Sequence, residues 1–330
     1  MIFEDLPTTP TSEELIDKAF SRAARSGRSK QGREAQESMT QTATNILSDN
    51  LQNVVTEWPD FDDVDPFYRE LADAIVDASD YGVDAGGVDA LRQSLSEVTW
   101  ASRQTRQIGE DAMAKMRKAD VDLARKHRKQ AFARMADVVE DVSENLLLIN
   151  EARNDLRDLP EINPDEPAIV VAGYPNVGKS SFVNGITRAR NETAEYPFTT
   201  KGIGVGHFER DRVRYQIVDT PGLLDRPPEE RNEIESQAVS ALEHLADCVL
   251  VLLDASMNCG YPVDVQLELR DAIAEQFGDA PVMTVCNKSD LSTDVEADHY
   301  MSVETGENVE SVVDAAVEAI DWEQELPFER

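Results

Sequence analysis

A glycine-rich octapeptide constrains the fold of this chain more than any other feature: residues 173–180 read GYPNVGKS. The apolar run 168–172 precedes it and is typical of a buried strand, while residues 181–184 are suited to the start of a helix. Gly173 and Gly178 let successive backbone N–H groups point inward at the positive end of that helix, where anions bind. A glycine-rich turn without a ligand is the alternative, but the order strand, loop, helix favours a parallel α/β domain that binds phosphate.

The side chains of this phosphate loop have chemical roles that follow from its shape. We expect Lys179 to reach the β- and γ-phosphates of a nucleotide and the Ser180 hydroxyl to bind Mg²⁺. Backbone N–H groups around them hold phosphate oxygens. The predicted phosphate-binding residues are Asn176, Val177, Gly178, Lys179, Ser180 and Ser181.

A second motif, the tetrapeptide 287–290 (NKSD), indicates which base is bound. It follows the apolar run 282–286 and so lies at the carboxyl end of a predicted strand, where open α/β sheets bind ligands. A buried, ionised Asp290 can accept hydrogen bonds from N1–H and the 2-amino group of guanine, whereas adenine offers neither donor. Lys288 can pack its aliphatic stem over the base. Such tetrapeptides also occur in ordinary loops, but its position after a phosphate loop predicts GTP and GDP as ligands.

The tetrapeptide 219–222 (DTPG) occupies the interval between these two motifs. Residues 213–218 alternate as a strand and end directly before it. We expect Asp219 to hold Mg²⁺ through a water molecule and the Gly222 N–H to sense the γ-phosphate.

Two more segments complete the predicted site. Residues 196–201 supply a threonine for a second side-chain contact to Mg²⁺, and we favour Thr200 over Thr199. Residues 302–306 can close over the guanine with backbone groups. The predicted catalytic residues are Lys179, Thr200, Asp219 and Gly222, and the predicted base-binding residues are Asn287, Lys288, Asp290, Ser302 and Val303.

These motifs resemble the Obg/HflX-like GTPases and, more narrowly, the nucleolar GTP-binding protein 1 family, which also occurs in archaea. The likeness extends to residues 196–201, 206–208, 224–227, 230–232 and 259–261 and, in the amino-terminal half, to residues 58–61 and 65–68. The resemblance implies a Ras-like GTPase that acts in assembly of the large ribosomal subunit. It also implies an amino-terminal helical domain that contacts ribosomal RNA.

Residue 223 bears on the rate of hydrolysis. Ras-like enzymes that orient water with glutamine carry it directly after Asp-X-X-Gly, but this position is Leu223 here. We therefore predict slow intrinsic hydrolysis. Asn176 matches an asparagine found in the phosphate loops of potassium-stimulated relatives, so our hypothesis is that K⁺ binds beside it and supports hydrolysis. The alternative is that Asn176 only stabilises the loop.

The overall charge predicts a halophilic, archaeal host. The chain has 32 Lys and Arg against 65 Asp and Glu, a formal charge of −33. In molar salt the Debye length falls to roughly 3 Å, which screens self-repulsion and keeps a carboxylate-rich surface hydrated. From residue 161 onward the lysines are Lys179, Lys201 and Lys288, each within a motif.

Two basic segments stand out from this acidic background. Residues 18–33 hold 6 basic and no acidic residues, and residues 101–134 hold 10 basic and 4 acidic residues. A solvated surface is the alternative, but in so acidic a chain we favour contact with RNA phosphates. Sequence-specific reading is not indicated, because aromatic residues do not alternate with these basic residues.

The predicted fold class is an amino-terminal antiparallel helical bundle followed by a Ras-like P-loop GTPase domain with a mostly parallel six-stranded sheet. An apolar stripe from Met135 to Ile149, at three- and four-residue steps, supports one long helix of the bundle. The predicted helices span residues 34–57, 65–80, 84–108 and 111–158. The predicted divisions are a basic arm at 1–33, the bundle at 34–159, a proline-rich linker at 160–167 and the GTPase domain at 168–330.

The remaining expectations concern location and partners. Three cysteines without metal-ligand spacing favour a reducing cytoplasm, and no signal peptide or apolar run near ~18 residues is seen, so no membrane contact is expected. We expect a monomer away from the ribosome. Two functions stay open: a GTP-driven switch in ribosome assembly, or an RNA-binding scaffold whose nucleotide only stabilises the fold. An ATP-driven enzyme is a distant third.

Overall fold

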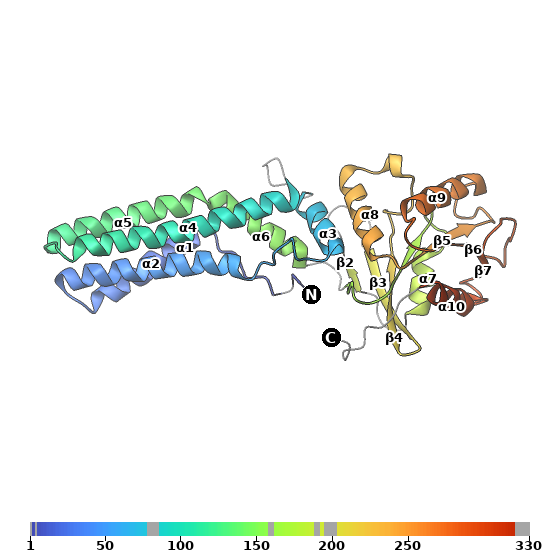
Figure 1. Ribbon diagram of the computed structural model, residues 1–330, viewed down its shortest axis with the longest axis horizontal. Helices are drawn as coiled ribbons and strands as arrows, with labels where there is room; N and C mark the ends of the chain where they lie inside the picture. The colour runs from blue at the N-terminus through green and yellow to red at the C-terminus, as the bar shows by residue number, and fades with distance from the viewer. Residues whose placement is uncertain are drawn as a thin grey trace. The chain divides into compact units, whose positions relative to one another are not determined.

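In the computed structural model, the described residues are 2–3, 5–77, 86–157, 162–187, 192–194 and 203–320 (Figure 1). They belong to two compact units, each built from separate stretches of the chain. The first, a helical unit, comprises Ile2–Phe61 and Ser79–Arg157, and the second, a sheet unit, comprises Met1, Asp62–Ala78 and Asp158–Arg330.

The helical unit contains long helices that lie side by side (Figure 1). Its helices are α1 (Ser12–Arg28), α2 (Gly32–Thr56), α4 (Gly87–Met116), α5 (Val121–Asp141) and α6 (Ser143–Arg157). Small residues allow the backbones of α2 and α4 to come close together. At Gly109 an added Cβ would collide with the Thr44 side chain, and the Ser102 hydroxyl donates to the Ser48 carbonyl at 2.8 Å. The bundle fold expected for this half of the chain is confirmed.

The predicted basic arm is wrong for most of its length, because residues 12–28 form α1. Thr11 begins this helix with a capping box, in which Thr11 and Glu14 each accept a hydrogen bond from the other's backbone N–H. Ala19 and Ala23 are fully buried, so α1 presents an apolar face to the bundle and its basic residues to solvent. The proline- and threonine-rich opening of the chain concealed this helix start.

The predicted helix boundaries in the second half of the bundle also differ from the structure. The helix expected to end at 108 continues to Met116, since Ile108, Ala112 and Met116 extend its buried face. The helix predicted at 111–158 covers the end of α4 and two further helices, α5 and α6. Asp120 caps the first, α5, by accepting from the Leu123 N–H at 2.8 Å, and the helical run breaks again at Val142.

Helix α3 (Pro66–Asp77) corrects the predicted domain boundary, because it belongs to the sheet unit and not to the bundle. It packs against α8 (Glu233–Leu245) and buries Phe67, Leu71 and Ile75. Its partner α8 lies far away in the sequence, and Glu70 of α3 contacts His244 of α8 at 3.0 Å.

The sheet unit is built on seven described strands in the order β2-β3-β4-β1-β5-β6-β7. The strands are β1 (Ala168–Ala172), β2 (Glu192–Ala194), β3 (Ile203–Arg210), β4 (Val213–Asp219), β5 (Cys248–Asp254), β6 (Val282–Asn287) and β7 (His299–Tyr300). Pairing is antiparallel between β2, β3 and β4 and parallel from β4 to β7. The predicted fold class is thus confirmed, and the three-residue edge strand β2 is an addition to the six expected strands.

Helices α7 (Lys179–Ile186), α9 (Val263–Gln276) and α10 (Val309–Ala319) and the 3₁₀ turn Pro228–Glu230 complete the sheet unit with α8. Strands β1 and β5 are buried along their whole length, as their apolar sequences predict. Among the described residues, no helix is long and apolar enough to cross a membrane.

The described part of the predicted linker, residues 162–167, is packed against the sheet. The fully buried Gln216 side chain accepts from the Asn163 N–H at 2.7 Å and donates to the Asn163 carbonyl at 2.7 Å. The Tyr68 hydroxyl of α3 donates to the Ile162 carbonyl. Proline content therefore misled the prediction: the buried amide of Gln216 makes this segment part of the sheet unit.

Parallel pairing brings the functional segments to one edge of the sheet. Val171 pairs with Asp219, and Asp254 pairs with Asn287. The phosphate loop, the DTPG tetrapeptide and the NKSD tetrapeptide thus all follow strand ends on the same edge, as the sequence predicts.

Candidate nucleotide-binding site

The phosphate loop has the backbone conformation that its glycines predict. Gly173 has φ +128° and Gly178 has φ +108°, both in the region that favours glycine. A Cβ on Gly173 would collide with the Leu252 carbonyl, and one on Gly178 would collide with the Asn287 side-chain nitrogen. Asn176, at φ +64°, is a non-glycine residue held in the same region. The loop therefore approaches β5 and β6 more closely than any side chain would allow.

Lys179 begins α7 and is buried, with 6% of its surface exposed. Its Nζ donates to the Gly173 carbonyl at 2.6 Å and to the Tyr174 carbonyl at 3.1 Å. The ammonium group is therefore held at the phosphate loop, where its positive charge adds to the partial charge of the α7 amino terminus. This is an anion-binding arrangement.

The predicted residues from both motifs line one cavity of about 1250 Å³. Its wall includes Asn176, Gly178, Lys179, Ser180 and Ser181 from the phosphate loop and Asp219 from the end of β4. It also includes Asn287, Lys288, Asp290 and Val303. The cavity thus has a phosphate end and a base end, and its volume accommodates a nucleotide.

Asn287 joins the two ends of this cavity. It is 2% exposed, its Nδ2 donates to the Val177 carbonyl at 2.8 Å, and its Oδ1 accepts from the Val303 N–H at 3.1 Å. Val177 and Val303 therefore take part in this connection through backbone groups. Ser302 is fully buried and its hydroxyl accepts from the Thr305 N–H at 3.2 Å, which shapes the 302–306 segment.

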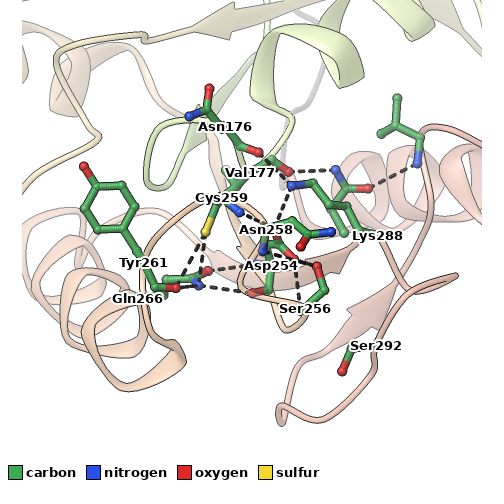
Figure 2. Close-up of polar contacts among 12 residues, drawn as sticks. Asn176, Val177, Asp254, Ser256, Asn258, Cys259, Tyr261, Gln266, Lys288 and Ser292 are labelled. Carbon is green, nitrogen blue, oxygen red and sulfur yellow. Dashed lines mark hydrogen bonds and ion pairs between the residues drawn. The ribbon is translucent and has the colours of Figure 1, made fainter.

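Lys288 spans the gap between the phosphate loop and β5 (Figure 2). Its Nζ donates to the Asn176 carbonyl at 2.9 Å and pairs with Asp254 Oδ2 at 2.6 Å. Burial by itself raises the pKa of Asp254, but hydrogen bonds from Lys288 and Ser256 outweigh this and hold that pKa below its ordinary value. Asp254 is ionised at neutral pH and compensates the charge of Lys288.

Asp290 lies at the surface of the cavity and is exposed, not buried as its predicted role assumed. Its carboxylate is accessible to a base that enters beside Lys288. The discrimination against adenine expected from Asp290 then depends on the base covering this carboxylate, because an unpaired carboxylate is costly only once water is removed from it.

Two oxygen groups at the phosphate end suit a magnesium ion. The Ser180 hydroxyl and the Asp219 carboxylate line the same cavity, and both are hard oxygen ligands of the kind that Mg²⁺ prefers beside phosphate groups. Asp219 is 6% exposed at the end of β4. Thr200, the predicted second ligand, lies outside the described residues.

In the DTPG segment, the Gly222 N–H that we expect to sense the γ-phosphate has a protein partner. This residue has φ +83°, and its N–H donates to Asp225 Oδ2 at 2.9 Å, while Pro221 and Asp225 line the cavity. Contact of the Gly222 N–H with a γ-phosphate therefore requires release from Asp225. Leu223 is fully buried, and the described lining residues include no glutamine or histidine.

Sequence reasoning missed several residues of the site. Asn184, Asp225, Asn258 and Leu291 also line the cavity. Asn258 follows β5 and directly precedes the family-like segment 259–261, but no site role was assigned to that loop, which the pairing of β5 with β6 brings to the site. Asp225 could have been suspected from its position three residues after Gly222.

Two protein-family models match the chain. The sequence profile described as "NOG1 N-terminal helical domain" matches residues 3–163, and that described as "Nucleolar GTP-binding protein 1 (NOG1)" matches residues 233–290. The uncharacterized protein MJ1408 of Methanocaldococcus jannaschii is 36% identical over 88% of this chain and 81% of its own length. Nucleolar GTP-binding protein 1 of Drosophila melanogaster is 37% identical over 74% of this chain.

The chain spans only part of the longer relatives, 36% of the Drosophila protein and 48% of nucleolar GTP-binding protein 1 of Eremothecium gossypii. Among solved structures, a Plasmodium falciparum protein assigned to nucleolar GTP-binding protein 1 is 34% identical and has a TM-score of 0.45, covering 49% of this chain and 90% of that chain.

Proposed function

Because this chain belongs to the nucleolar GTP-binding protein 1 family, we propose that it is a GTP-binding switch that hydrolyses GTP slowly during assembly of the large ribosomal subunit. The observation that carries GTP binding is the cavity shared by the two motifs, in which Asn287 fastens the base end to the phosphate loop. The site residues then act on the two ends of one nucleotide.

In the proposed reaction, the residues at the phosphate end hold and polarise the triphosphate. Lys179 and the amino terminus of α7 stabilise negative charge on the β- and γ-phosphates. Ser180, Asp219 and Thr200 would hold Mg²⁺, which supplies charge neutralisation at the phosphates when bound. We propose slow turnover because Leu223 is buried and has no polar group to orient water.

Potassium is a further part of the proposal. Asn176 lines the cavity at the phosphate end, and its strained backbone turns its carbonyl toward Lys288. We propose that K⁺ binds beside the Asn176 side chain and the phosphates, where a cation offsets developing negative charge. The alternative, that Asn176 serves only the loop conformation, predicts no dependence on the monovalent cation.

The proposed partner is ribosomal RNA in a precursor of the large subunit, bound through the helical unit. All six basic residues of segment 18–33 are exposed, and nine of the ten in segment 101–134 are exposed, with Arg128 partly buried. Arg128 instead donates to Gln36 at 2.8 Å and lies over the Phe132 ring. The exposed residues support a contact with phosphates that does not depend on sequence.

We further propose that the protein acts as a monomer in the cytoplasm of a halophilic archaeon. The formal charge of −33 supports the saline host, since molar salt screens both self-repulsion and the repulsion between an acidic protein and RNA. The part of RNA binding that the exposed basic segments carry should weaken as the KCl concentration rises, because each phosphate contact releases counterions.

The nucleotide assignment is tested with Asp290→Asn. Removing the carboxylate should weaken GTP and GDP binding on the order of 100-fold, since two charge-assisted hydrogen bonds are lost, and should favour xanthosine nucleotides, whose extra carbonyl accepts from Asn. Titration with GDP, xanthosine diphosphate and ADP measures this. Equal binding of GDP by both proteins, or tight binding of ADP by the wild type, would overturn the assignment.

The switch is tested against the scaffold alternative with Lys179→Ala in a host depleted of the native protein. A switch requires nucleotide, so large-subunit precursors should accumulate on sucrose gradients. Normal assembly with a variant that binds no GTP, as measured by titration, would favour the scaffold. Thr293→Ala, an exposed change at a residue outside the described cavity wall, is the matched control.

A further inference from the structure

Asp254 is a fully buried carboxylate next to the nucleotide site and outside every recognised motif (Figure 2). It ends β5 and pairs in register with Asn287, the first residue of the NKSD tetrapeptide. A buried charge is costly unless it is paired and hydrogen-bonded, so its partners indicate what it does.

Both oxygens of Asp254 are occupied by donors from two segments. Oδ1 accepts from the Ser256 N–H and from the Ser256 hydroxyl, and Oδ2 accepts from the Cys259 N–H at 2.8 Å and from Lys288 Nζ at 2.6 Å. Among the described residues, the positively charged partner of this carboxylate is Lys288. The carboxylate is thus fixed by the loop that follows it, and Lys288 is fixed by the carboxylate.

The loop 256–261 forms a folded support around Asp254. The Met257 N–H donates to the Asp254 carbonyl at 3.1 Å, and the buried Gln266 side chain of α9 pairs with both backbone groups of Asp254, at 2.8 and 3.1 Å. Gln266 also donates to the Tyr261 carbonyl at 2.8 Å. Figure 2 shows the bonds of Gln266 to Asp254 and to Tyr261. Helix α9 therefore determines where the carboxylate lies.

This support reaches the phosphate loop at two places. The Tyr261 ring stacks on the Tyr174 ring with centroids 4.2 Å apart, and Lys288 bridges Asp254 to the Asn176 carbonyl. Strained backbone marks the same cluster, because Asn176, Met257 and Lys288 have φ of +64°, +59° and +57°. Non-glycine residues keep such conformations only where surrounding contacts hold them, and they occur preferentially at functional sites.

We propose that Asp254 is a positioning residue for base recognition, which holds the Lys288 stem in the place where it covers the guanine. This inference rests on the proposed function. A lysine side chain is flexible and its ammonium strongly hydrated, so a free Lys288 would lose rotamer freedom on binding. With its Nζ already held between Asp254 and Asn176, the Lys288 stem is preorganised. The loop 256–261 therefore supports base binding indirectly: it holds Asp254, and Asp254 holds Lys288.

Two consequences separate this role from a general structural one. The base is the same in GDP and GTP, so loss of Asp254 should weaken both by the same factor. The effect should also require Lys288. If Asp254 acts through Lys288, adding Asp254→Asn to a variant that already lacks the Lys288 ammonium should cause no further loss of affinity. The second change also removes the buried carboxylate charge that the first change leaves unpaired.

The experiment is a double-mutant cycle on the full chain, with Kd for GDP and GTP measured by fluorescent-nucleotide titration. Asp254→Asn and Lys288→Met should each weaken binding roughly 10-fold, and the double variant should bind no more weakly than Lys288→Met alone. Additive losses would overturn the proposal, as would wild-type affinity in Asp254→Asn. Asp271→Asn, an exposed carboxylate on α9 paired with Arg270, is the matched control and should leave Kd unchanged.

A milder variant covers the case in which Asp254→Asn does not fold. Ser256→Ala removes one of the donors to Oδ1 and leaves the charge pair intact, so a loss of about threefold in both Kd values is expected, with a native thermal unfolding transition. No loss would contradict the proposal. Binding of GDP by the wild type, measured in the same series, separates a failure of the proposed function from a failure of the Asp254 proposal. If the wild type does not bind GDP, the proposed function is refuted. If the wild type binds GDP but the variants show none of these effects, only the role of Asp254 is refuted.

Discussion

The side-chain amide of Asn287 donates to the Val177 carbonyl at 2.8 Å, which fastens the end of β6 to the phosphate loop. The same side chain accepts from the Val303 N–H at 3.1 Å. One buried amide therefore connects three segments of the proposed nucleotide site. A change in any of these segments is expected to affect the other two.

Asn287→Ala should weaken both folding and binding. It leaves the Val177 carbonyl and the Val303 N–H without their partner, and each loss of this kind costs about 1–3 kcal/mol. With two such losses, we expect the free energy of unfolding of the sheet unit to fall by about 2–6 kcal/mol and Kd for GDP to rise by at least tenfold, measured by urea unfolding and titration. Asn154→Ala, an exposed change in the helical unit, should do neither. Unchanged GDP binding would contradict the connecting role of Asn287.

Gly178→Ala should abolish nucleotide binding, and Gly185→Ala should not. At Gly178 the added Cβ would collide with the Asn287 amide, and φ of +108° strains any L side chain. At Gly185, inside α7, no atom lies within 4 Å of the added Cβ, so alanine should stabilise the helix by roughly 0.5–1 kcal/mol. Thermal unfolding with and without GDP measures both. Normal binding by Gly178→Ala would show that the loop tolerates displacement from β6.

GTP hydrolysis should be several-fold faster in KCl than in NaCl at matched molarity. The reason is the proposed K⁺ site beside Asn176, where Na⁺ is too small to contact the same ligands. Asn176→Ala should remove the difference between the salts while GDP still binds. Phosphate release under single-turnover conditions measures the rate. Equal rates in the two salts for the wild type would refute the potassium hypothesis.

The stability contributed by Asp254 should disappear in acid. Its pKa in the folded chain lies below the value of about 3.9 expected in the unfolded chain, so its stabilisation is fully present above that value and is lost as the pH falls through the folded pKa. The difference in unfolding free energy between wild type and Asp254→Asn should therefore shrink below about pH 4. Urea unfolding at pH 7 and at pH 3, in the same KCl concentration, measures it. A difference independent of pH would mean that the carboxylate charge does not stabilise the fold.

The phosphate and base motifs could be located from sequence because their function depends on local order. GYPNVGKS must turn between a strand and a helix, and NKSD must follow a strand, so both motifs could be assigned to one edge of a parallel sheet. The Asp254 support could not be predicted in this way. In sequence it is an aspartate after an apolar run, and its importance arises from Lys288, which pairs with it only through the register of β5 and β6.

For the fold, the sequence likewise predicted the class but not every element. Alternating strands and helices identified the α/β class, but α1 was concealed by a proline- and threonine-rich opening, and Pro160 to Pro167 suggested a free linker. Gln216 shows why composition failed there, since the buried amide that binds Asn163 lies on β4, far along the chain. Membership of α3 in the sheet unit likewise depends on a distant partner.

The order of the elements along the chain also governs how the protein can be made. Helix α3, with its buried apolar residues Phe67, Leu71 and Ile75, leaves the ribosome long before α8, the helix against which it packs. At roughly 5–20 residues per second, this surface stays uncovered on the order of ten seconds during synthesis, which makes the nascent chain a substrate for chaperones. The same order determines how the chain can be divided: a fragment that begins at Ile162 lacks α3 and leaves the apolar face of α8 open to water.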